Sequence, residues 1–418
     1  MKPAAFVSRC LSCVALLIFG ATLTATAQEA DALFNPDVLH RIDLRIHTAD
    51  WEKLKQNFQE NTYYPADFVW NGQVVYNAGI RSRGLGSRSG TKPGLRVDFD
   101  YYNTEQSFLS LKSVVLDNLL QDHSGIHETV AMRVFARLGV PAPRETHARL
   151  YVKDEYIGLY AIVESIDKRF LARVFGSIAE DTQNDGHLYE YNWVDRWTFG
   201  YFGSDLAPYA LRFDPKTHEK DSDAAKFGPI ENLVRLVNDL PIERYTTELN
   251  EHLDLHAFMR YLAAQNFVGQ NDGFLGYEGV NNFYFYRREN SPQHVFIAWD
   301  EDLAFWGPEY PIDMRVQDNV LARKAMQIPE LRSAYYAGLS DAMRLTDEPT
   351  GPEGLTWLEY EIKRQAAMIH DAMRDDPSKP YSMEEHEAAQ AHMISFARNR
   401  SRYLSEQMGT SQPSRRRP

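Results

Sequence analysis

Residues 265–306 read QNFVGQNDGFLGYEGVNNFYFYRRENSPQHVFIAWDEDLAFW. The pattern predicts a helix that ends near Gly269, a turn at 271–273, and then two strands, over 282–286 and 295–299. Two strands joined this closely form a hairpin, so the start of the first strand and the end of the second lie at one edge. The stretch therefore predicts a hairpin that carries polar side chains at one end.

Three oxygen-bearing side chains are expected to meet there, namely Asp272 from the preceding loop, Asn282 and Asp300. Carboxylate and amide oxygens are the ligands that Mg²⁺ requires. The set also suits phosphoryl transfer, in which one Asp positions the acceptor hydroxyl while an Asn and a second Asp hold metal against the nucleotide phosphates. The alternative is that each residue only caps a turn or a strand end. Asp300 favours function, because a carboxylate between Trp299 and Phe305 is costly unless it is paired or binds a metal.

The rest of the sequence predicts an α+β protein with two lobes. Strands dominate the first half, where hairpins are expected at Asn71-Gly72 and over 148–163, with one helix over 128–138. We expect a strand-rich N-terminal lobe of about residues 35–165 and a mainly helical C-terminal lobe of about 166–407. No Gly- or Ser-rich linker separates the halves, so a cleft between the two lobes is the expected site. The helices expected in the second half cover 230–240, 253–267, 330–344, 357–374 and 383–407.

The two ends of the chain predict processing and disorder. Residues 1–27 have the basic start, apolar stretch and small residues of a secretory signal peptide, so we expect export to the periplasm or the exterior. The alternative is a membrane anchor, but the apolar run is shorter than the roughly 20 residues that a bilayer core needs. Both cysteines, Cys10 and Cys13, lie in this segment, which excludes disulfides and thiol chemistry from the mature chain. Residues 408–418 are typical of a disordered basic tail.

Charge and composition limit the classes of molecule that the protein is expected to bind. The formal net charge of −13 argues against general nucleic-acid binding and suits a protein that binds cations. After the signal peptide, no segment is apolar enough to cross a membrane. The 13 histidines form no HExxH or similar pair, so the sequence gives little support for a catalytic zinc.

A second informative stretch is basic. Residues 81–96 read RSRGLGSRSGTKPGLR and place a Gly- and Ser-rich loop between two strands. Glycines let backbone amides approach an anion closely, and Arg or Lys neutralises its charge. The loop is not a phosphate-binding Walker loop, because the Gly-Lys-Ser/Thr ending and the following helix are missing. The alternative is a solvated basic hairpin.

Taken together, the order of these motifs resembles the CotH family of spore-coat, atypical secreted protein kinases. The resemblance spans roughly residues 40 to 400. It rests first on the basic stretch 81–96 and on a central pair of short motifs at 158–160 and 164–167. It rests also on three motifs within residues 265–306, at 271–272, 282–286 and 299–302.

The resemblance implies a divergent protein-kinase-like fold that binds ATP and Mg²⁺ and phosphorylates serine or threonine of an exported or surface protein. It implies that Asp272 is the catalytic or metal-binding Asp of a loop. It further implies that Asn282 and Asp300 hold metal and that Asp302 supports the metal from behind.

The same resemblance implies a nucleotide site on the strand-rich lobe. Arg83, Lys92 and Arg96 would face phosphates, and Glu164 would lie beside the adenine or pair with a basic residue. The chain departs from the family pattern at His127, where the family usually has an arginine.

Two other functions remain open alongside Mg²⁺-dependent protein phosphorylation. One is a non-catalytic surface or envelope binding protein that keeps the fold. The other is a metal-dependent phosphoesterase that uses the same carboxylates on a different substrate.

Overall fold

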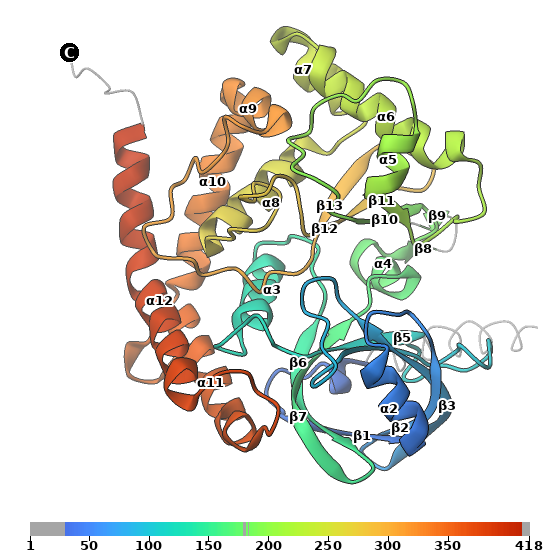
Figure 1. Ribbon diagram of the computed structural model, residues 1–418. Coiled ribbons are helices and arrows are strands. Elements are labelled where there is room, and N and C mark those ends of the chain that lie inside the picture. Colours follow the sequence, from blue (N-terminus) through green and yellow to red (C-terminus); the bar gives the residue numbers. More distant parts are fainter. Residues whose placement is uncertain (1–29, 179–180, 183, 412–418) are drawn as a thin grey trace, which may run out of the picture.

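The computed structural model describes residues 30–178, 181–182 and 184–411 (Figure 1). The predicted signal peptide, residues 1–27, lies outside the described residues. The disordered tail was predicted to start at residue 408, but helix α12 (Met383–Ser411) continues through residues 408–411. Gly409 does not end this helix, and residues 412–418 lie outside the description.

The N-terminal lobe is a closed β-barrel in the order β1-β2-β3-β4-β5-β7-β6. The barrel closes where β1 pairs in parallel with β6, whereas β1 pairs with β2 in antiparallel fashion. In β1, buried and more exposed side chains alternate, which sends Ile42 and Leu44 into the barrel. The bounds are β1 (His40–Ile46), β2 (Tyr64–Trp70), β3 (Gln73–Arg83), β4 (Gly94–Asp98), β5 (Ser113–Asp117), β6 (Glu145–Val152) and β7 (Glu155–Glu164).

Two tight turns set the register of this barrel. Asn71 and Gly72 connect β2 to β3 with φ of 47° and 78°. Lys153 and Asp154 connect β6 to β7 with φ of 53° and 68°. Two successive positive φ angles are typical of the two-residue turn whose twist matches that of the strands. The two predicted hairpins are therefore present.

The C-terminal lobe combines a four-stranded sheet, in the order β11-β10-β12-β13, with a group of helices. The sequence predicted β12 and β13 but not β10 or β11, which are short and lack a clear alternation. Its strands are β10 (His187–Tyr191), β11 (Phe213–Pro215), β12 (Phe283–Arg287) and β13 (His294–Ala298), and a separate small pair is β8 (Ser177–Ile178) with β9 (Asp181–Thr182).

Six of the helices match the predicted helical segments, with bounds shifted by a few residues except at the start of α6. These are α3 (His127–Arg137), α6 (Asp223–Asp239), α8 (Leu255–Val268), α10 (Pro329–Thr346), α11 (Trp357–Asp375) and α12. The remaining ones are short: α2 (Thr48–Gln56), α4 (Lys168–Phe175), α5 (Ala207–Arg212), α7 (Ile242–Leu249), α9 (Val320–Gln327) and the 3₁₀ turn Pro352–Gly354. Among the described residues, none of these helices has both the length and the apolar character needed to cross a bilayer.

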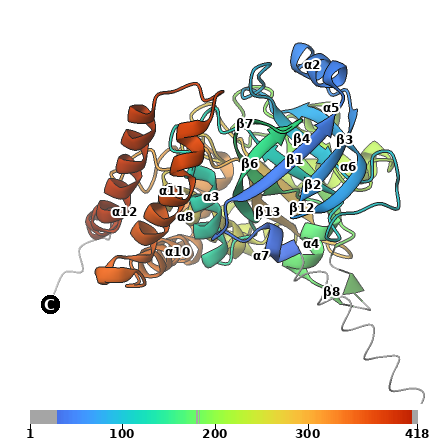
Figure 2. The ribbon, with the colours of Figure 1, turned by 90° about the horizontal axis from the view of Figure 1, so that it is seen from below.

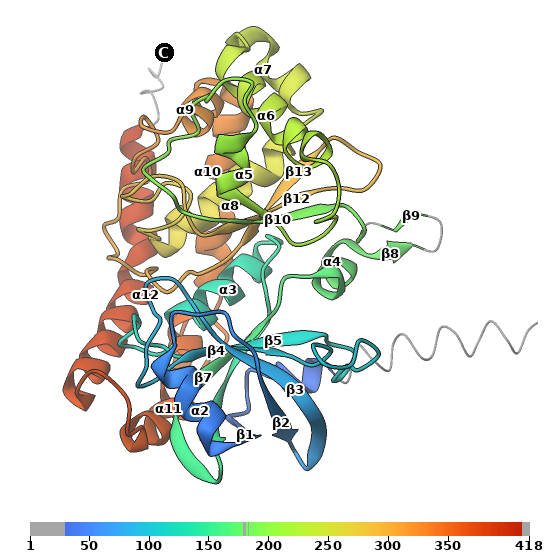
Figure 3. The same ribbon diagram turned by 45° about the vertical axis from the view of Figure 1, so that its right-hand side comes forward.

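The barrel and the four-stranded sheet face each other, and α3 lies between them (Figure 3). Helix α3 belongs in sequence to the strand-rich half, yet it packs on α8 and α10 and shares the core of the helical lobe. Helices α11 and α12 lie beside the barrel when the molecule is viewed from below (Figure 2). The fold is therefore α+β, with a strand-rich lobe followed by a mainly helical one, as predicted from the sequence.

Candidate active site

A cleft of about 540 Å³ separates the barrel from the four-stranded sheet. Its lining combines the basic stretch of the barrel with the polar end of the β12–β13 hairpin. The residues predicted from sequence that line it are Arg83, Arg96, Asp272, Asn282, Asp300 and Asp302. The structure thus brings six of the eight predicted site residues to one place.

The polar end of the hairpin forms as the sequence pattern suggests. Phe283 pairs with Ala298 in the ladder, so Asn282 and Asp300 lie just beyond the same end of β12 and β13. Both residues have φ of 55°, in the left-handed region that non-glycine residues rarely adopt. Such strained positions persist only where the surrounding structure holds them, and they cluster at functional sites.

Asp272 is held against this end by two amides. Asn281 Nδ2 and Asn282 Nδ2 donate to Asp272 Oδ2 at 3.1 and 3.2 Å. Asn282 Nδ2 also lies 3.0 Å from the Asp272 carbonyl oxygen, which accepts from it. Asp272 therefore has a fixed carboxylate orientation at the base of the cleft.

The side chain of Gln270 joins the two segments that carry the aspartates. Its Oε1 accepts from the Asp272 N–H at 3.1 Å, and its Nε2 donates to the Asp300 carbonyl oxygen at 3.2 Å. Gln270 is buried. The sequence analysis did not single out this residue, because an amide that bridges two backbones leaves no local motif.

Burial raises the pKa of the aspartates in the cleft, and the charges of neighbouring carboxylates add to the rise. Burial, followed by the charge of Asp300, raises the pKa of Asp272 to about 6, although the Asn281 and Asn282 hydrogen bonds oppose the change. Burial raises the pKa of Asp300, with Arg83 opposing and Asp117 adding to the rise. Burial and the charge of Asp300 hold the pKa of Asp302 well above its usual range. Negative charge is therefore in excess in the cleft, and a cation would relieve it.

Five further acids line the cleft and were not predicted as site residues: Asp117, Asp122, Glu128, Glu190 and Asp214. Asp117, Glu128 and Glu190 come from the end of β5, the first turn of α3 and strand β10. Burial and the nearby carboxylate of Glu145 raise the pKa of Glu128 well above its usual range. These acids are far apart in sequence, so only the assembled fold reveals them.

Two cations of the cleft lining lie close to these acids: Lys216, whose Nζ is 2.6 Å from Glu190 Oε2, and Arg83. The Arg83 guanidinium lies 4.9 Å from the centre of the Trp299 ring, and its Nη1 lies 3.7 Å from Asp117 Oδ2. Burial lowers the pKa of Arg83, but the charges of Asp117, Glu190 and Asp300 outweigh this and raise it overall. Arg83 therefore stays charged inside the cleft.

Arg96 lies on β4 opposite Arg81 of β3, two residues along the strand from Arg83. Its Nε donates to Asp98 Oδ1 at 2.8 Å, and its Nη2 donates to Ser113 Oγ at 3.2 Å. These partners fix the guanidinium on the wall of the cleft.

The glycine-rich loop between β3 and β4 is anchored from below by Arg88. Arg88 donates to the Gly84 carbonyl oxygen at 2.6 Å, to the Phe58 carbonyl oxygen at 3.1 Å and to Asn61 Oδ1 at 2.6 Å. Gly84 has φ of 113°, and an added Cβ would lie 2.6 Å from Ser87 Oγ. The loop conformation therefore requires glycine, and its residues 84–88 line the cleft.

Lys92 lies outside the cleft, which corrects the expectation that it faces a phosphate. Its ammonium is buried and forms an ion pair with Asp376 at 2.7 Å, under the ring of Tyr160. Asp376 also accepts from the Leu159 N–H at 2.9 Å. The lysine thus joins the barrel to the residue that follows α11, and its charge is already neutralised.

Glu164 also lies outside the lining of the cleft. Arg144 Nη2 and Arg173 Nη2 each donate to its carboxylate at 2.6 Å, and the Arg144 N–H donates at 3.0 Å. Of the two predicted environments, the structure shows the pairing with basic residues. The next two residues along the chain, Ser165 and Ile166, line the cleft instead.

His127 begins α3 behind the carboxylates. Its Nδ1 lies 2.8 Å from the Asp302 carbonyl oxygen and 3.4 Å from Asp122 Oδ1. The residue therefore positions the turn that carries Asp302 and is not part of the cleft lining.

Comparison with known proteins gives a family and a small number of relatives. The profile of the family described as CotH kinase protein matches residues 80–404. The inner spore coat protein H of Bacillus subtilis (strain 168) is 23% identical over 387 residues, which cover 90% of this chain and 99% of that protein.

Two solved structures also align. The proinflammatory kinase CtkA of Helicobacter pylori aligns with a TM-score of 0.29 and 12% identity, over 76% of this chain and 95% of that one. The complex of HipA, HipB and operator DNA from Shewanella oneidensis MR-1 aligns with a TM-score of 0.35 and 14% identity, over 88% of this chain and 74% of that one.

Proposed function

The chain belongs to the CotH kinase protein family, and we propose that it is a protein kinase. It would use Mg²⁺ and transfer phosphate from ATP to a serine or threonine hydroxyl of a protein partner. The observation that carries the proposal is the single cleft in which Asp272, Asn282 and Asp300 lie opposite Arg83 and the glycine-rich loop. Phosphoryl transfer depends on positioning and charge stabilisation, and this cleft offers groups for both.

The oxygen donors of the cleft fit a hard divalent cation. Asn282 and Asp300 would hold Mg²⁺ and Asp302 would lie behind them, with Asp272 either a third ligand or the base beside the ion. Burial raises the pKa of these three aspartates, and the charge of neighbouring carboxylates adds to the rise. When bound, Mg²⁺ neutralises and orients the phosphate oxygens of the nucleotide.

Asp272 is the side chain best suited to orient the acceptor hydroxyl and accept its proton. A general base works best when its pKa lies near the operating pH. With a pKa of about 6, Asp272 is mostly deprotonated at neutral pH and remains a better base than an ordinary aspartate. The amides of Asn281 and Asn282 keep its Oδ2 directed to one side.

The phosphates would lie against the barrel side of the cleft. Arg83 and Arg96 offer two fixed guanidinium groups, which bind phosphate oxygens through charge-assisted hydrogen bonds. The backbone of loop residues 84–88 faces the same space. Lys92 and Glu164 are left out of this assignment because they lie outside the cleft lining and are buried against their own partners.

We further propose that the protein acts outside the cytoplasm on an exported or surface protein. The signal-peptide pattern of residues 1–27 supports export. A relative named as an inner spore coat protein supports a place among coat or surface proteins.

Labelled ATP tests the proposal directly. The protein is incubated with γ-labelled ATP, Mg²⁺ and a mixture of Ser- and Thr-containing peptides, beside the Asp300→Asn variant. The proposal predicts label on peptide that the variant does not transfer. Release of free phosphate without peptide labelling would favour the phosphoesterase, and a lack of metal-dependent ATP binding would favour the non-catalytic binding protein.

A further inference from the structure

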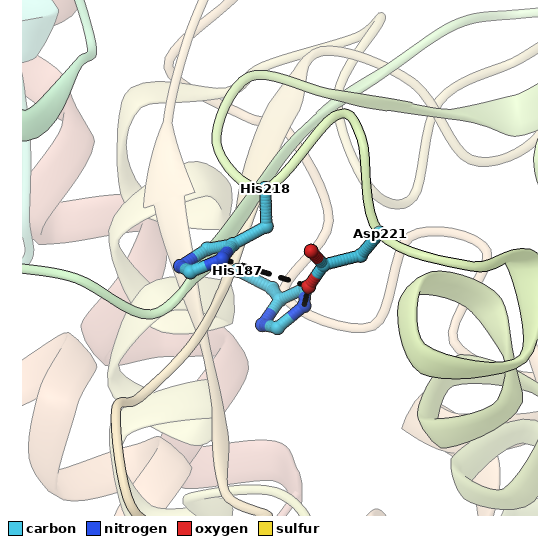
Figure 4. Close-up of side chains that lie close together, drawn as sticks. All are labelled: His187, His218 and Asp221. Carbon is cyan, nitrogen blue, oxygen red and sulfur yellow. Dashed lines mark hydrogen bonds and ion pairs between the residues drawn. The ribbon is translucent and has the colours of Figure 1, made fainter.

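A second group of ligand-type side chains lies at the far end of β10 from the cleft (Figure 4). His187 begins β10, and the loop after β11 carries His218 and Asp221. One ligand atom from each of the three residues lies within 4.8 Å of the others. Among the residues that the structure describes, this is the one group of three or more His, Cys, Asp or Glu side chains that meets this distance, and the carboxylates of the cleft do not meet it.

His218 is oriented as a ligand would be. Its Nε2 lies 2.7 Å from the Asp185 carbonyl oxygen, so this nitrogen carries the proton and donates to that oxygen. The other nitrogen, Nδ1, is left with its lone pair and lies 3.6 Å from Asp221 Oδ2. Metal-binding histidines are typically held in this way, with one ring nitrogen on a backbone carbonyl and the other on the ion.

His187 converges on the same carboxylate oxygen. Its Nε2 lies 3.2 Å from Asp221 Oδ2. The two imidazole rings stack with their centres 4.4 Å apart and their planes 17° from parallel. The side chains of His187, His218 and Asp221 are 13%, 28% and 41% exposed, so an ion can reach them from solvent.

Arg287 opposes a cation here. It pairs with His187 across β10 and β12, and its Nη2 lies 2.7 Å from His187 Nδ1 and 3.3 Å from His187 Nε2. A metal ion on His187 Nε2 requires a proton on Nδ1, so the guanidinium must turn aside. Lys168 is also near, but its charge is taken up by Asp185.

We propose that His187, His218 and Asp221 bind a divalent transition metal ion of the Zn²⁺ class, with water completing the coordination. Imidazole nitrogen suits Zn²⁺, Cu²⁺ and Ni²⁺, whereas Mg²⁺ prefers oxygen ligands. The site is thus chemically distinct from the carboxylates of the cleft, and it does not depend on the proposed kinase function.

The ion would fasten the loop after β11 to the start of β10. Thr217, in this loop, already accepts from the Leu188 N–H at 2.8 Å and donates to the Gly186 carbonyl oxygen at 2.7 Å. The other end of β10 carries Glu190 into the cleft. Metal binding would therefore stabilise a strand that forms part of the cleft wall.

Calorimetric titration with ZnCl₂ alone tests the proposal. The protein carries Asp300→Asn, so that Zn²⁺ binding in the cleft contributes less to the measured heat. We expect one Zn²⁺ to bind and an excess of Mg²⁺ not to displace it. His218→Ala or Asp221→Asn should each weaken binding at least about tenfold, because the effect of losing a ligand exceeds that of losing an outer partner. His256→Ala is the matched control, since His256 is an exposed histidine 3.5 Å from Glu330 and should leave binding unchanged.

Arg287→Gln gives a sharper arm of the test, because removal of the opposing cation should tighten Zn²⁺ binding. The proposal is overturned if the parent protein binds no Zn²⁺, or if neither ligand substitution weakens binding beyond the His256→Ala control. Weaker binding in Arg287→Gln would also contradict it. The Asp221 side chain is 41% exposed, so its asparagine variant should fold and gives the answer even if His218→Ala fails to fold.

Discussion

Asp272 and Asp300 are linked through one side chain, because Gln270 accepts from the Asp272 N–H and donates to the Asp300 carbonyl oxygen. The Asn271 N–H also donates to the Leu303 carbonyl oxygen at 3.3 Å. The loop before the hairpin and the turn after it are thereby held at a fixed separation. The positions of both carboxylates depend on this connection.

Replacement of Gln270 by Met should separate metal binding from general stability. The substitution keeps the volume but removes these two hydrogen bonds and the one to Glu301, so we expect Mg²⁺ affinity to fall about tenfold, as for other residues that position metal ligands. Calorimetric titration with Mg²⁺ measures this effect. Gln390→Met is the control: Gln390 is also buried, but it donates to the Ser124 carbonyl oxygen, away from the cleft. Equal Mg²⁺ affinity in the two variants would show that Gln270 has only a structural role.

Asp300→Asn should abolish Mg²⁺-dependent nucleotide binding while leaving the melting temperature nearly unchanged or slightly raised. The pKa of Asp300 is raised overall, which means that its charge is unfavourable in the folded cleft, and a neutral side chain of the same shape removes that cost. Calorimetry with ATP and Mg²⁺, together with thermal unfolding, gives both quantities. Asp341→Asn, on the exposed face of α10, should change neither. A large drop in melting temperature for Asp300→Asn would favour a purely structural role.

Mg²⁺ affinity should rise with pH through about 6. A proton on Asp272 competes with the metal, and burial and Asp300 raise the pKa of Asp272 to about 6. Asn281→Ala removes a hydrogen bond that lowers this pKa, so the midpoint should move to higher pH. Titrations between about pH 5 and 8 test this, with the pKa of a free aspartate near 3.9 as the reference. An affinity that stays flat across this range would contradict the assignment.

The same shift affects stability in the absence of metal. Because the pKa of Asp272 is raised in the folded state, its stabilising contribution is complete below the ordinary aspartate pKa and is lost as pH rises through about 6. Asp272→Asn does not titrate. The melting temperature of Asp272→Asn relative to the parent protein should therefore increase between pH 4 and pH 7.

Lys92→Met should lower stability without weakening nucleotide binding. The Lys92–Asp376 pair is fully buried, and removal of one partner of such a pair costs about 3–5 kcal/mol. Urea unfolding measures the loss. The double variant Lys92→Met/Asp376→Asn should recover part of it, because the unpaired carboxylate is then neutral and its amide oxygen still accepts from the Leu159 N–H. A stable Lys92→Met variant with weakened ATP binding would instead restore Lys92 to the nucleotide site.

The local patterns of the sequence predicted the hairpin end of the site. Asn282 and Asp300 flank two strands whose lengths and polarity are readable, and their pairing follows from the short connection between them. The turn between β2 and β3 was likewise predictable, because Asn71 and Gly72 tolerate the positive φ angles that this turn needs. Short-range chemistry therefore determined these elements.

The sequence could not reveal partners that only the tertiary fold brings together. Lys92 appeared available because its partner, Asp376, follows a helix near the other end of the chain. Glu128 and Glu190 reach the cleft because of where α3 packs and because β10 pairs with β12, and neither this packing nor this pairing has a local signature. The histidine group is similar, since His187 and His218 meet only because β10 and β11 are neighbours.

A crystal structure with Mn²⁺ and a non-hydrolysable ATP analogue tests the central claim most directly, since anomalous scattering locates the ion. The account predicts an ion bound by oxygens of Asp300 and of Asp272 or Asn282, with the analogue's phosphates between the ion and Arg83. An ion or nucleotide bound elsewhere, with this cleft occupied only by water, would contradict it.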